Sequence, residues 1–247
     1  MTADAPGSSG PRIARPDRVT AGDQAEAALF DAIMDGTIAP GSALRLHDLA
    51  GQLGMSIMPV REALRRLEAL GLVEIVAHKG AWVRPLTLDD LYDTYFTRMH
   101  LERLAIRTAA RWFTDADAHL ARQTLSEHVA ARDAGDRVGA RDAHERFHFA
   151  MYAASRSQWL MRSIGPAWRN SERYRIESMR HPEQVSARSD EHELMLDALI
   201  AHDADTAAAL LTNHLRSALE FVAAELREQA TEDPGVPTPL AGLLDEA

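Results

Sequence analysis

The sequence has no cysteine among its 247 residues, so neither disulfides nor thiolate metal ligands contribute to its fold. It also lacks any apolar run approaching the ~18 residues of a membrane-spanning helix. Its first sixteen residues contain no apolar stretch typical of a secretory signal. We therefore expect a cytoplasmic protein without membrane contact. The chain is long enough for more than one domain, and its 46% hydrophobic content allows a sizeable core.

A helix-turn-helix pattern lies between residues 44 and 72. The run LRLHDLAGQL (44–53) predicts a short helix, and Gly54 marks the turn after it. A second helix follows, with Ser56 placed to cap it and Pro59 in its first turn, where a missing N–H costs nothing. Gly71 ends this helix, and its apolar stripe is Val60, Leu64, Leu67 and Leu70. Off the stripe lie three arginines that we expect to act mainly through DNA: Arg61, Arg65 and Arg66.

Two β-prone runs follow at 72–76 and 81–83, and the residues AHKG (77–80) between them predict a hairpin. Helix, turn, helix and a two-stranded wing together indicate a winged helix-turn-helix, whose second helix enters the major groove of DNA. The alternative is a helix hairpin that only packs, with the wing and the arginines present by coincidence. The candidate DNA-binding residues are Arg45, His47, Ser56, Ile57, Met58, Arg61, Arg65, His78, Lys79 and Gly80.

The formal charge of −10 agrees with DNA binding only once it is divided along the chain. From residue 45 to 84, six Lys or Arg stand against four Asp or Glu and leave +2, so the remainder carries −12. A modestly basic head on an acidic body is compatible with DNA binding through the head alone. The motif, rather than the charge, carries that prediction.

Four segments follow from the pattern along the chain. Residues 1–19, rich in Pro, Gly, Ser and Ala, predict a disordered arm, and residues 230–247 a disordered tail. A first helix from Thr20 to Gly36 opens a DNA-binding domain at 20–86. Thr87 and Asp90 form an acidic capping box that starts a helical domain at 87–229.

The second domain predicts an antiparallel bundle with short connections and no strands. We expect its helices at residues 88–112, 115–133, 137–154, 158–179, 185–201 and 204–229. The predicted fold class is therefore mostly α, an N-terminal winged helix-turn-helix followed by an all-helical antiparallel bundle of about six helices.

Four histidines of this domain are candidate metal ligands. His144 and His148 lie four residues apart, so they project from one helical face and suit two ligands of one ion. His192 lies on the next helix but one and His214 on the last, and inward side chains of nonadjacent helices can converge on a bundle core. The sequence contains eleven histidines, so accidental pairs also occur. On spacing alone, each of the four could instead be a hydrogen-bonded core imidazole or an exposed one.

Arg98 is unusual because it falls on an inward helical stripe with Tyr95 and Glu102. Two interpretations remain open. Arg98 either pairs with Glu102 one turn away, or it binds a carboxylate ligand inside the bundle through its guanidinium fork.

The run from 33 to 83 resembles the DNA-binding domain of the GntR family of bacterial transcription regulators. The resemblance lies in DGTIAPGSAL (35–44), DLAGQLGMS (48–56), PVREALRRLEALGLV (59–73) and KGAWV (79–83). Family members usually carry a base-reading arginine after the serine, where this chain has Ile57, and a second basic position corresponds to His47. These departures do not disturb the fold, but they put the family's usual operator in question.

Residues 87–229 resemble the all-helical FCD effector domain of the FadR-type branch of that family. Metal-binding members carry an aspartate, a histidine four residues later and two more histidines on later helices, and the matching positions are His144, His148, His192 and His214. With His144 in place of the aspartate, the site is either degenerate or holds a divalent ion by four imidazoles, which favour Zn²⁺ or Ni²⁺ over Mn²⁺. Affinity should then fall below about pH 6, where imidazoles protonate.

The resemblance implies a ligand-responsive regulator that binds double-stranded operator DNA as a homodimer and senses a small carboxylate effector. An arginine and a glutamate recur in the family at Arg98 and Glu102, and many members sense organic acids. Two alternatives are a direct metal-ion sensor and a metalloenzyme with a DNA-tethering head. We predict no enzyme, because four protein ligands leave little room for an activated water and no catalytic motif is present.

Overall fold

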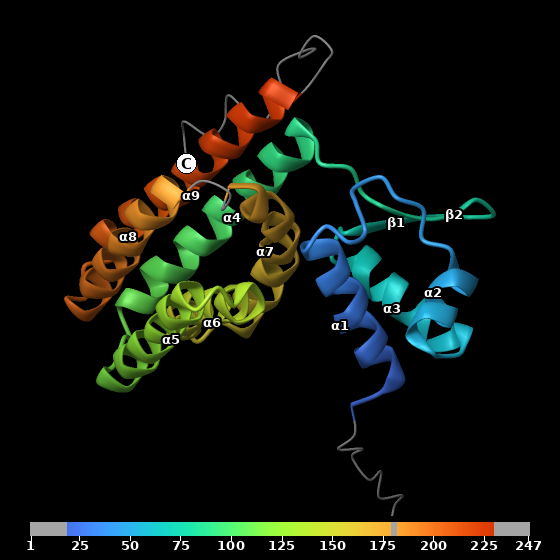
Figure 1. Ribbon diagram of the computed structural model, residues 1–247. Helices are drawn as coiled ribbons and strands as arrows, with labels where there is room; N and C mark the ends of the chain where they lie inside the picture. Colours follow the sequence, from blue (N-terminus) through green and yellow to red (C-terminus); the bar gives the residue numbers. More distant parts are fainter. Residues whose placement is uncertain (1–18, 179–181, 230–247) are drawn as a thin grey trace, which may run out of the picture.

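The computed structural model describes residues 19–178 and 182–229, apart from the side chains of 176–189 and 229. Figure 1 shows two units side by side, a small head and a larger helical bundle, which confirms the predicted fold class. The predicted tail, and the predicted arm except Val19, lie outside the described residues. None of the described helices combines the length and the apolar composition that a membrane crossing requires.

The head is a winged helix-turn-helix, built in chain order from α1 (Ala21–Met34), α2 (Leu46–Leu53), α3 (Ile57–Ala69), β1 (Val73–Val76) and β2 (Gly80–Val83). Thr20 and Asp23 form a complete capping box at the start of α1. Gly54 adopts φ 62° in the turn between α2 and α3, a left-handed conformation that glycine reaches without strain. Two expectations were wrong: α2 begins at Leu46 rather than Leu44, and Ser56 is the N-cap of α3 without a side-chain capping bond.

The wing is fixed to the head along both edges of β2. On one edge β2 pairs antiparallel with β1, in the register Val73 with Val83 and Val76 with Gly80. On the other edge the segment 41–44 pairs with it, since Gly41 N donates to Val83 O (2.9 Å) and Leu44 N donates to Ala81 O (2.7 Å). The buried side chains of α1, α3 and both strands form one apolar core beneath this hairpin.

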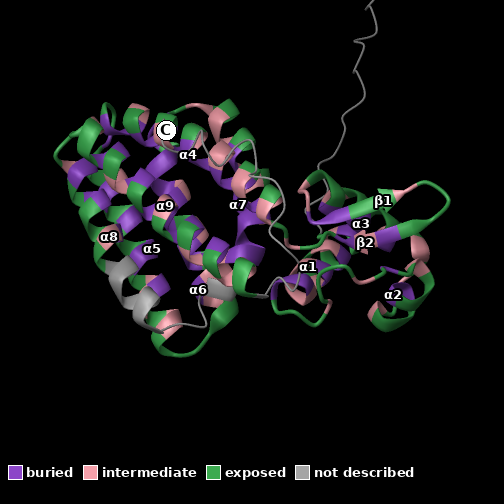
Figure 2. Ribbon diagram, turned by 90° about the horizontal axis from the view of Figure 1, so that it is seen from above, coloured by how far each residue is buried: buried purple, intermediate pink, exposed green. Residues whose placement is uncertain are grey.

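The described part of the bundle contains six helices, whose ends lie within three residues of the predicted ones: α4 (Leu88–Ala110), α5 (Asp115–Asp133), α6 (Arg137–Ala153), α7 (Gln158–Ser178), α8 (Pro182–Ile200) and α9 (Ala204–Gln229). α4 packs against both α7 and α9, while α5 and α6 form a hairpin. Buried residues line the inside of the bundle in Figure 2, separately from the core of the head. The largest fully buried side chains here are Trp168, Tyr95, Tyr152, Tyr174 and Phe147.

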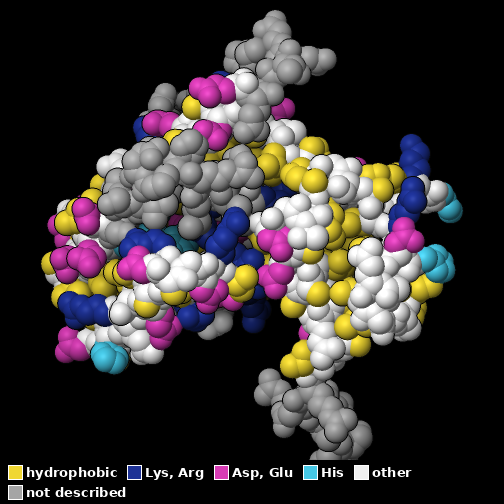
Figure 3. All heavy atoms as spheres, in the orientation of Figure 1, with side chains coloured by type: hydrophobic (Ala, Val, Ile, Leu, Met, Phe, Trp, Pro, Cys, Tyr) yellow, Lys and Arg dark blue, Asp and Glu magenta, His cyan; other side chains and the backbone are white. Residues whose placement is uncertain are grey.

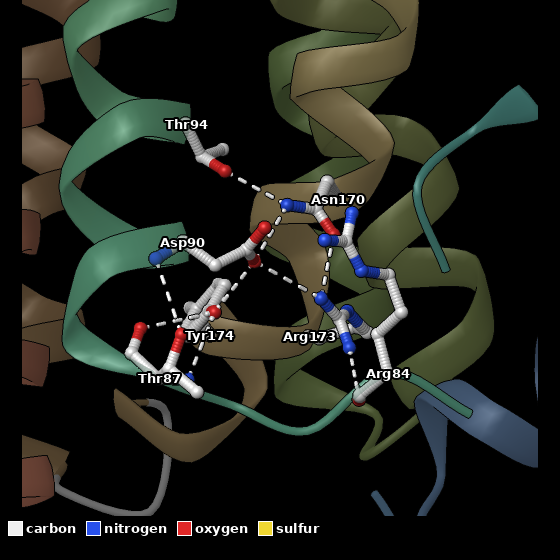
Figure 4. Close-up of polar contacts among 7 residues, drawn as sticks. All are labelled: Arg84, Thr87, Asp90, Thr94, Asn170, Arg173 and Tyr174. Carbon is white, nitrogen blue, oxygen red and sulfur yellow. Dashed lines mark hydrogen bonds and ion pairs between the residues drawn. The ribbon is translucent and has the colours of Figure 1, made fainter. Parts of the chain in front are cut away.

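Asp90 connects the start of α4 to α7. Thr87 accepts the expected capping bond from Asp90 N, but the Asp90 carboxylate does not complete a capping box, because it turns toward α7 instead. Its Oδ2 accepts from Tyr174 Oη (2.7 Å), Asn170 Nδ2 (3.0 Å) and Arg173 Nη2 (3.2 Å), as Figure 4 shows. A single carboxylate thus joins the first turn of α4 to α7.

Arg173 also holds the linker itself. Its Nη1 donates to the carbonyl oxygen of Arg84 at 2.6 Å, at the point where the chain leaves the wing (Figure 4). A second contact lies on the other side of the head, where Arg141 of α6 forms an ion pair with Asp31 of α1 (2.6 Å) and lies over the Phe30 ring. The head is therefore held against the bundle both through the linker and through α1.

Asp90→Ala removes the acceptor shared by three donors and leaves Arg173, whose side chain is 3% exposed, without its carboxylate. We expect the free energy of unfolding to fall by about 3 kcal/mol, since removing one partner of a buried ion pair leaves an uncompensated charge. Urea unfolding measures the change, and Asp93→Ala, at an exposed position of the same helix, is the matched control. Equal stability of the two variants would contradict the expectation.

Candidate DNA-binding face and histidine cluster

A groove of about 520 Å³ lies between α3 and the wing. Its lining brings together six of the predicted DNA-binding residues: Arg45, Arg61, Arg65, His78, Lys79 and Gly80. Cationic and histidine side chains gather at this end of the head in Figure 3 (dark blue and cyan, right). A concave surface lined by cations suits the phosphate backbone of DNA.

The other four predicted DNA-binding residues, His47, Ser56, Ile57 and Met58, do not line the groove. Ile57 is half-buried and packs against the core of the head. Met58 is 66% exposed. The sequence pattern did not distinguish these two neighbours, which lie about 100° apart around the helix axis.

Arg66 does not belong to this face, although we expected it to act through DNA. It forms ion pairs with Asp23 (2.6 Å), Glu26 (3.1 Å) and Glu62, so it ties α3 to α1. The Arg66 guanidinium, together with hydrogen bonds from Thr20, lowers the pKa of Asp23 to about 2. Arg66 is therefore a structural residue, and Arg61 and Arg65 are the exposed arginines of α3.

The four predicted histidine ligands converge in the bundle. His144 and His148 come from α6, His192 from α8 and His214 from α9, and all four are buried. One ring nitrogen of each lies within 4.8 Å of the others. Nε2 of His148 and Nε2 of His192 are 3.2 Å apart, close to the separation of about 3.3 Å that two nitrogens on one tetrahedral zinc ion would have.

Two of these imidazoles are oriented by hydrogen bonds at Nδ1. Tyr152 donates its hydroxyl proton to Glu102 Oε2 (2.7 Å), so the Tyr152 oxygen accepts from His148 Nδ1 (3.1 Å). His214 Nδ1 donates to Glu191 Oε2 at 2.6 Å. Both arrangements leave Nε2 with its lone pair, as in the carboxylate–histidine–metal arrangements of metalloproteins.

The donor set fits a divalent ion. Burial, with smaller contributions from Arg175 and the neighbouring imidazoles, holds the pKa of His144 well below its usual range. The pKa of His148 is lowered in the same way, first by burial and then by His192, His214 and Arg98. Nδ1 of His144 is buried without a hydrogen-bond partner in the described part of the chain, a costly state that a metal bond would relieve.

Arg98 forms the pair with Glu102 that was one of its two predicted roles. Nε donates to Glu102 Oε1 (2.6 Å), Nη2 to Oε2 (3.3 Å), and Nη1 to Ser171 Oγ (2.8 Å). The guanidinium lies 4.5 Å from the ring centre of Trp168, and both charged side chains are buried. Burial opposes the charge of Arg98, but the Glu102 carboxylate outweighs it and raises the pKa of Arg98.

Sequence reasoning missed two neighbours of the cluster. His128 of α5 is buried with its ring 5.1 Å from that of His144, and its Nδ1 donates to Ala140 O (2.8 Å). Trp168 of α7 lies 5.0 Å from the His148 ring and 5.5 Å from the His144 ring. Neither residue belongs to a spaced motif, so only the folded arrangement reveals them.

The class that these features define is a DNA-binding regulator: a winged head with a cationic groove, joined to a helical domain with a buried cluster of possible ligands. Residues 21–83 match the model of the bacterial regulatory proteins of the gntR family, and residues 93–217 match that of the FCD domain. The chain therefore belongs to the GntR family, in its FadR-type branch, and is a transcription regulator rather than an enzyme. Regulators of this family bind operator DNA.

Named relatives agree with this assignment. The chain is 32% identical to the uncharacterized HTH-type transcriptional regulator BphR of Paraburkholderia xenovorans over 77% of its length and 80% of the relative. It is 30% identical to the Nta operon transcriptional regulator of Aminobacter aminovorans, over 78% and 90% of the two chains. Among solved structures, McbR/YncC of E. coli superposes with a TM-score of 0.73 at 25% identity, over 85% of this chain and all of that one.

After metal has been removed with a chelator, we expect the wild-type protein to bind one equivalent of Zn²⁺ or Ni²⁺ and the His148→Ala variant to bind none. An ion bound only by the folded state, at a hundred times its dissociation constant, should raise the melting temperature by about 5 °C or more. Elemental analysis and calorimetry measure the two effects, with the exposed His119→Ala as the matched control. Less than about a tenth of an equivalent after loading would rule the site out.

The pH dependence of the same protein follows from the lowered pKa values of His144 and His148. Because these imidazoles stay neutral to a lower pH than free histidine, metal binding should persist below the pH of about 6 expected from the sequence. The ion-free protein should lose stability as the pH falls below about 6.5, since the unfolded chain then binds more protons than the folded one.

Proposed function

We propose that the chain is a ligand-responsive regulator that binds operator DNA as a homodimer in the cytoplasm and senses a small organic acid in a metal-containing helical domain. The observation that carries the proposal is the convergence of four buried histidines in the domain that also holds the head in place. Paired winged heads commonly read palindromic operators, so a homodimer with two-fold symmetry suits this function.

The ion in this proposal is Zn²⁺ or Ni²⁺. All four donors are imidazole nitrogens, which suit these borderline cations better than they suit Mn²⁺. Four imidazoles would fill a tetrahedral zinc site, whereas an ion with a higher coordination number keeps positions for an effector. The choice of ion therefore decides whether an acid can reach the metal directly.

The effector is a small carboxylate, held between the ion and Arg98. Neutral ligands leave a divalent ion its full charge, while Glu102 cancels the charge of Arg98, so the attraction for an anion rests mainly on the ion. Three of the five guanidinium N–H groups are used by Glu102 and Ser171, and the other two have no partner among the described residues. Arg98 thus orients a bound carboxylate through its remaining N–H groups, and adds little to the net positive charge of the site.

The signal would reach the head through α7, which contacts both parts. Toward the histidines, α7 presents Trp168 and the Arg98-binding Ser171. Toward the linker it presents Arg173 and Tyr174, which hold Arg84 O and Asp90. An effector that binds two placements of α7 with different affinities would shift the head between them.

A second candidate, a direct metal sensor, is favoured by the completeness of the histidine set. Four protein ligands can saturate the ion without any effector. In that case the ion alone would change operator affinity, and it would exchange reversibly with a chelator. An ion that only anchors an acid would instead be retained through dialysis against the chelator.

Arg61→Ala should weaken operator binding about tenfold, because Arg61 lies on the exposed groove face of α3 and a direct DNA contact is lost. Arg66→Ala should leave operator affinity nearly unchanged and lower thermal stability, because Arg66 holds α3 to α1. Band shifts at moderate salt and thermal unfolding separate the two effects. Undiminished affinity in Arg61→Ala would overturn the assignment of α3 as recognition helix.

Small carboxylates should raise the melting temperature of the metal-loaded protein, and the corresponding amides should not. The response should vanish after chelation and weaken in the double variant Arg98→Met with Glu102→Gln. Replacing both partners avoids leaving Glu102 as an unpaired buried charge, which would destabilise the fold by itself.

Equal stabilisation by amides and acids would exclude an anion site. A change in operator affinity on adding the ion without any acid would favour the metal sensor instead. Running the screen separately with Zn²⁺ and Ni²⁺ tests whether a free coordination position is required.

A further inference from the structure

Met58, the second residue of α3, is an apolar side chain on a cationic surface. It is 66% exposed, and the other large exposed hydrophobics in the described part of the head are Val19, just before α1, and Ile75 of β1, at 36%. A long apolar side chain left in water at the start of a recognition helix contributes little to the fold. Its position suggests that Met58 contacts the molecule to which the recognition helix binds.

The helix geometry places Met58 on the same face as the arginines. Residues three and seven positions apart lie close together around an α-helix, so Met58, Arg61 and Arg65 form one outward stripe. The buried Val60 and Leu67 lie on the opposite side. The N-terminal residues of a recognition helix are the ones that contact base edges, so Met58 stands where direct readout occurs.

The chemistry of methionine restricts what it can read there. A thioether is at most a weak hydrogen-bond acceptor, so it cannot replace the water lost from a polar base edge. In the major groove, thymine is the base that presents an apolar group, its C5-methyl. Methionine is also unbranched and flexible, which lets it follow a methyl group whose position varies slightly.

We propose that Met58 reads the C5-methyl group of a thymine in the operator. The inference rests on the proposed operator binding and names one chemical group that this binding recognises. Ile57 cannot take this role in the same way, because it is half-buried and packs against the head core. Arg61 and Arg65 then hold the backbone and neighbouring bases, while Met58 selects for a methyl group.

The test uses the duplex that the wild-type protein selects from a random pool. In that duplex each thymine is replaced in turn by uracil, which removes the methyl group and leaves the hydrogen-bonding pattern unchanged. We expect one thymine per bound copy at which the replacement weakens wild-type binding about fourfold, the effect of losing contact with one buried carbon. Met58→Ala should bind the thymine and uracil duplexes equally, and Met58→Leu should keep the discrimination.

Leu194→Ala, which removes an exposed apolar side chain far along the chain in α8, is the matched control and should discriminate like wild type. The proposal is overturned if no uracil substitution affects wild-type binding, or if Met58→Ala retains the full discrimination. If instead the wild-type protein selects no duplex and shows no salt-sensitive DNA binding, operator binding itself fails. The two failures are therefore distinguishable.

Discussion

The carboxylate of Asp90 is the interaction on which the arrangement of the two domains depends. One oxygen accepts from Tyr174, Asn170 and Arg173, and Arg173 in turn holds the carbonyl of Arg84. The first turn of α4, the linker and α7 are thereby fixed in one polar network whose members are largely buried. Water has limited access to these groups, so removing one member leaves the remaining donors or acceptors without a partner, which lowers stability.

The histidine cluster depends on a second consequence of burial. Burial in the apolar bundle lowers the pKa of His144 and of His148, which favours the neutral imidazole that a metal ligand requires. The same burial makes the ion-free cluster unfavourable, because His144 Nδ1 has no partner among the described residues. Beside it, the Arg98–Glu102 pair brings two opposite charges into the bundle without a net charge, and the Tyr152 hydroxyl connects Glu102 to His148. The same few side chains thus affect both the stability of the bundle and its capacity to bind an ion.

Local signals in the sequence predicted the head and the helix boundaries well. Gly54 in its left-handed turn, the Thr87 cap at the start of α4 and the apolar stripe of α3 each act within a few residues, so their outcome can be read from spacing. The convergence of His144 and His148 was predictable for the same reason, and the family resemblance pointed to His192 and His214 as the other two candidate ligands.

Contacts between distant residues could not be read in this way. Arg66 finds Asp23 and Glu26 some 40 residues away on α1, and only the packing of α1 on α3 reveals that its charge is already used. His128 reaches the cluster because α5 and α6 form a hairpin, and the Asp90 carboxylate binds partners 80 or more residues away instead of completing the local capping box. In each case the position of the side chain depends on a tertiary contact that no local sequence pattern encodes.

The double-sided pairing of β2 has a consequence for operator architecture. With β1 on one edge and residues 41–44 on the other, the wing cannot tilt independently of α2 and α3, so each head meets DNA as a rigid body. The linker that leaves this body is itself clamped by Arg173. Half-sites of an operator repeat at intervals of about 34–36 Å, one turn of the double helix. In the proposed dimer of such heads, that interval would have to be matched by the way the two bundles pair. The spacing of the operator would then be set by the pairing of the bundles rather than by the heads that bind the half-sites.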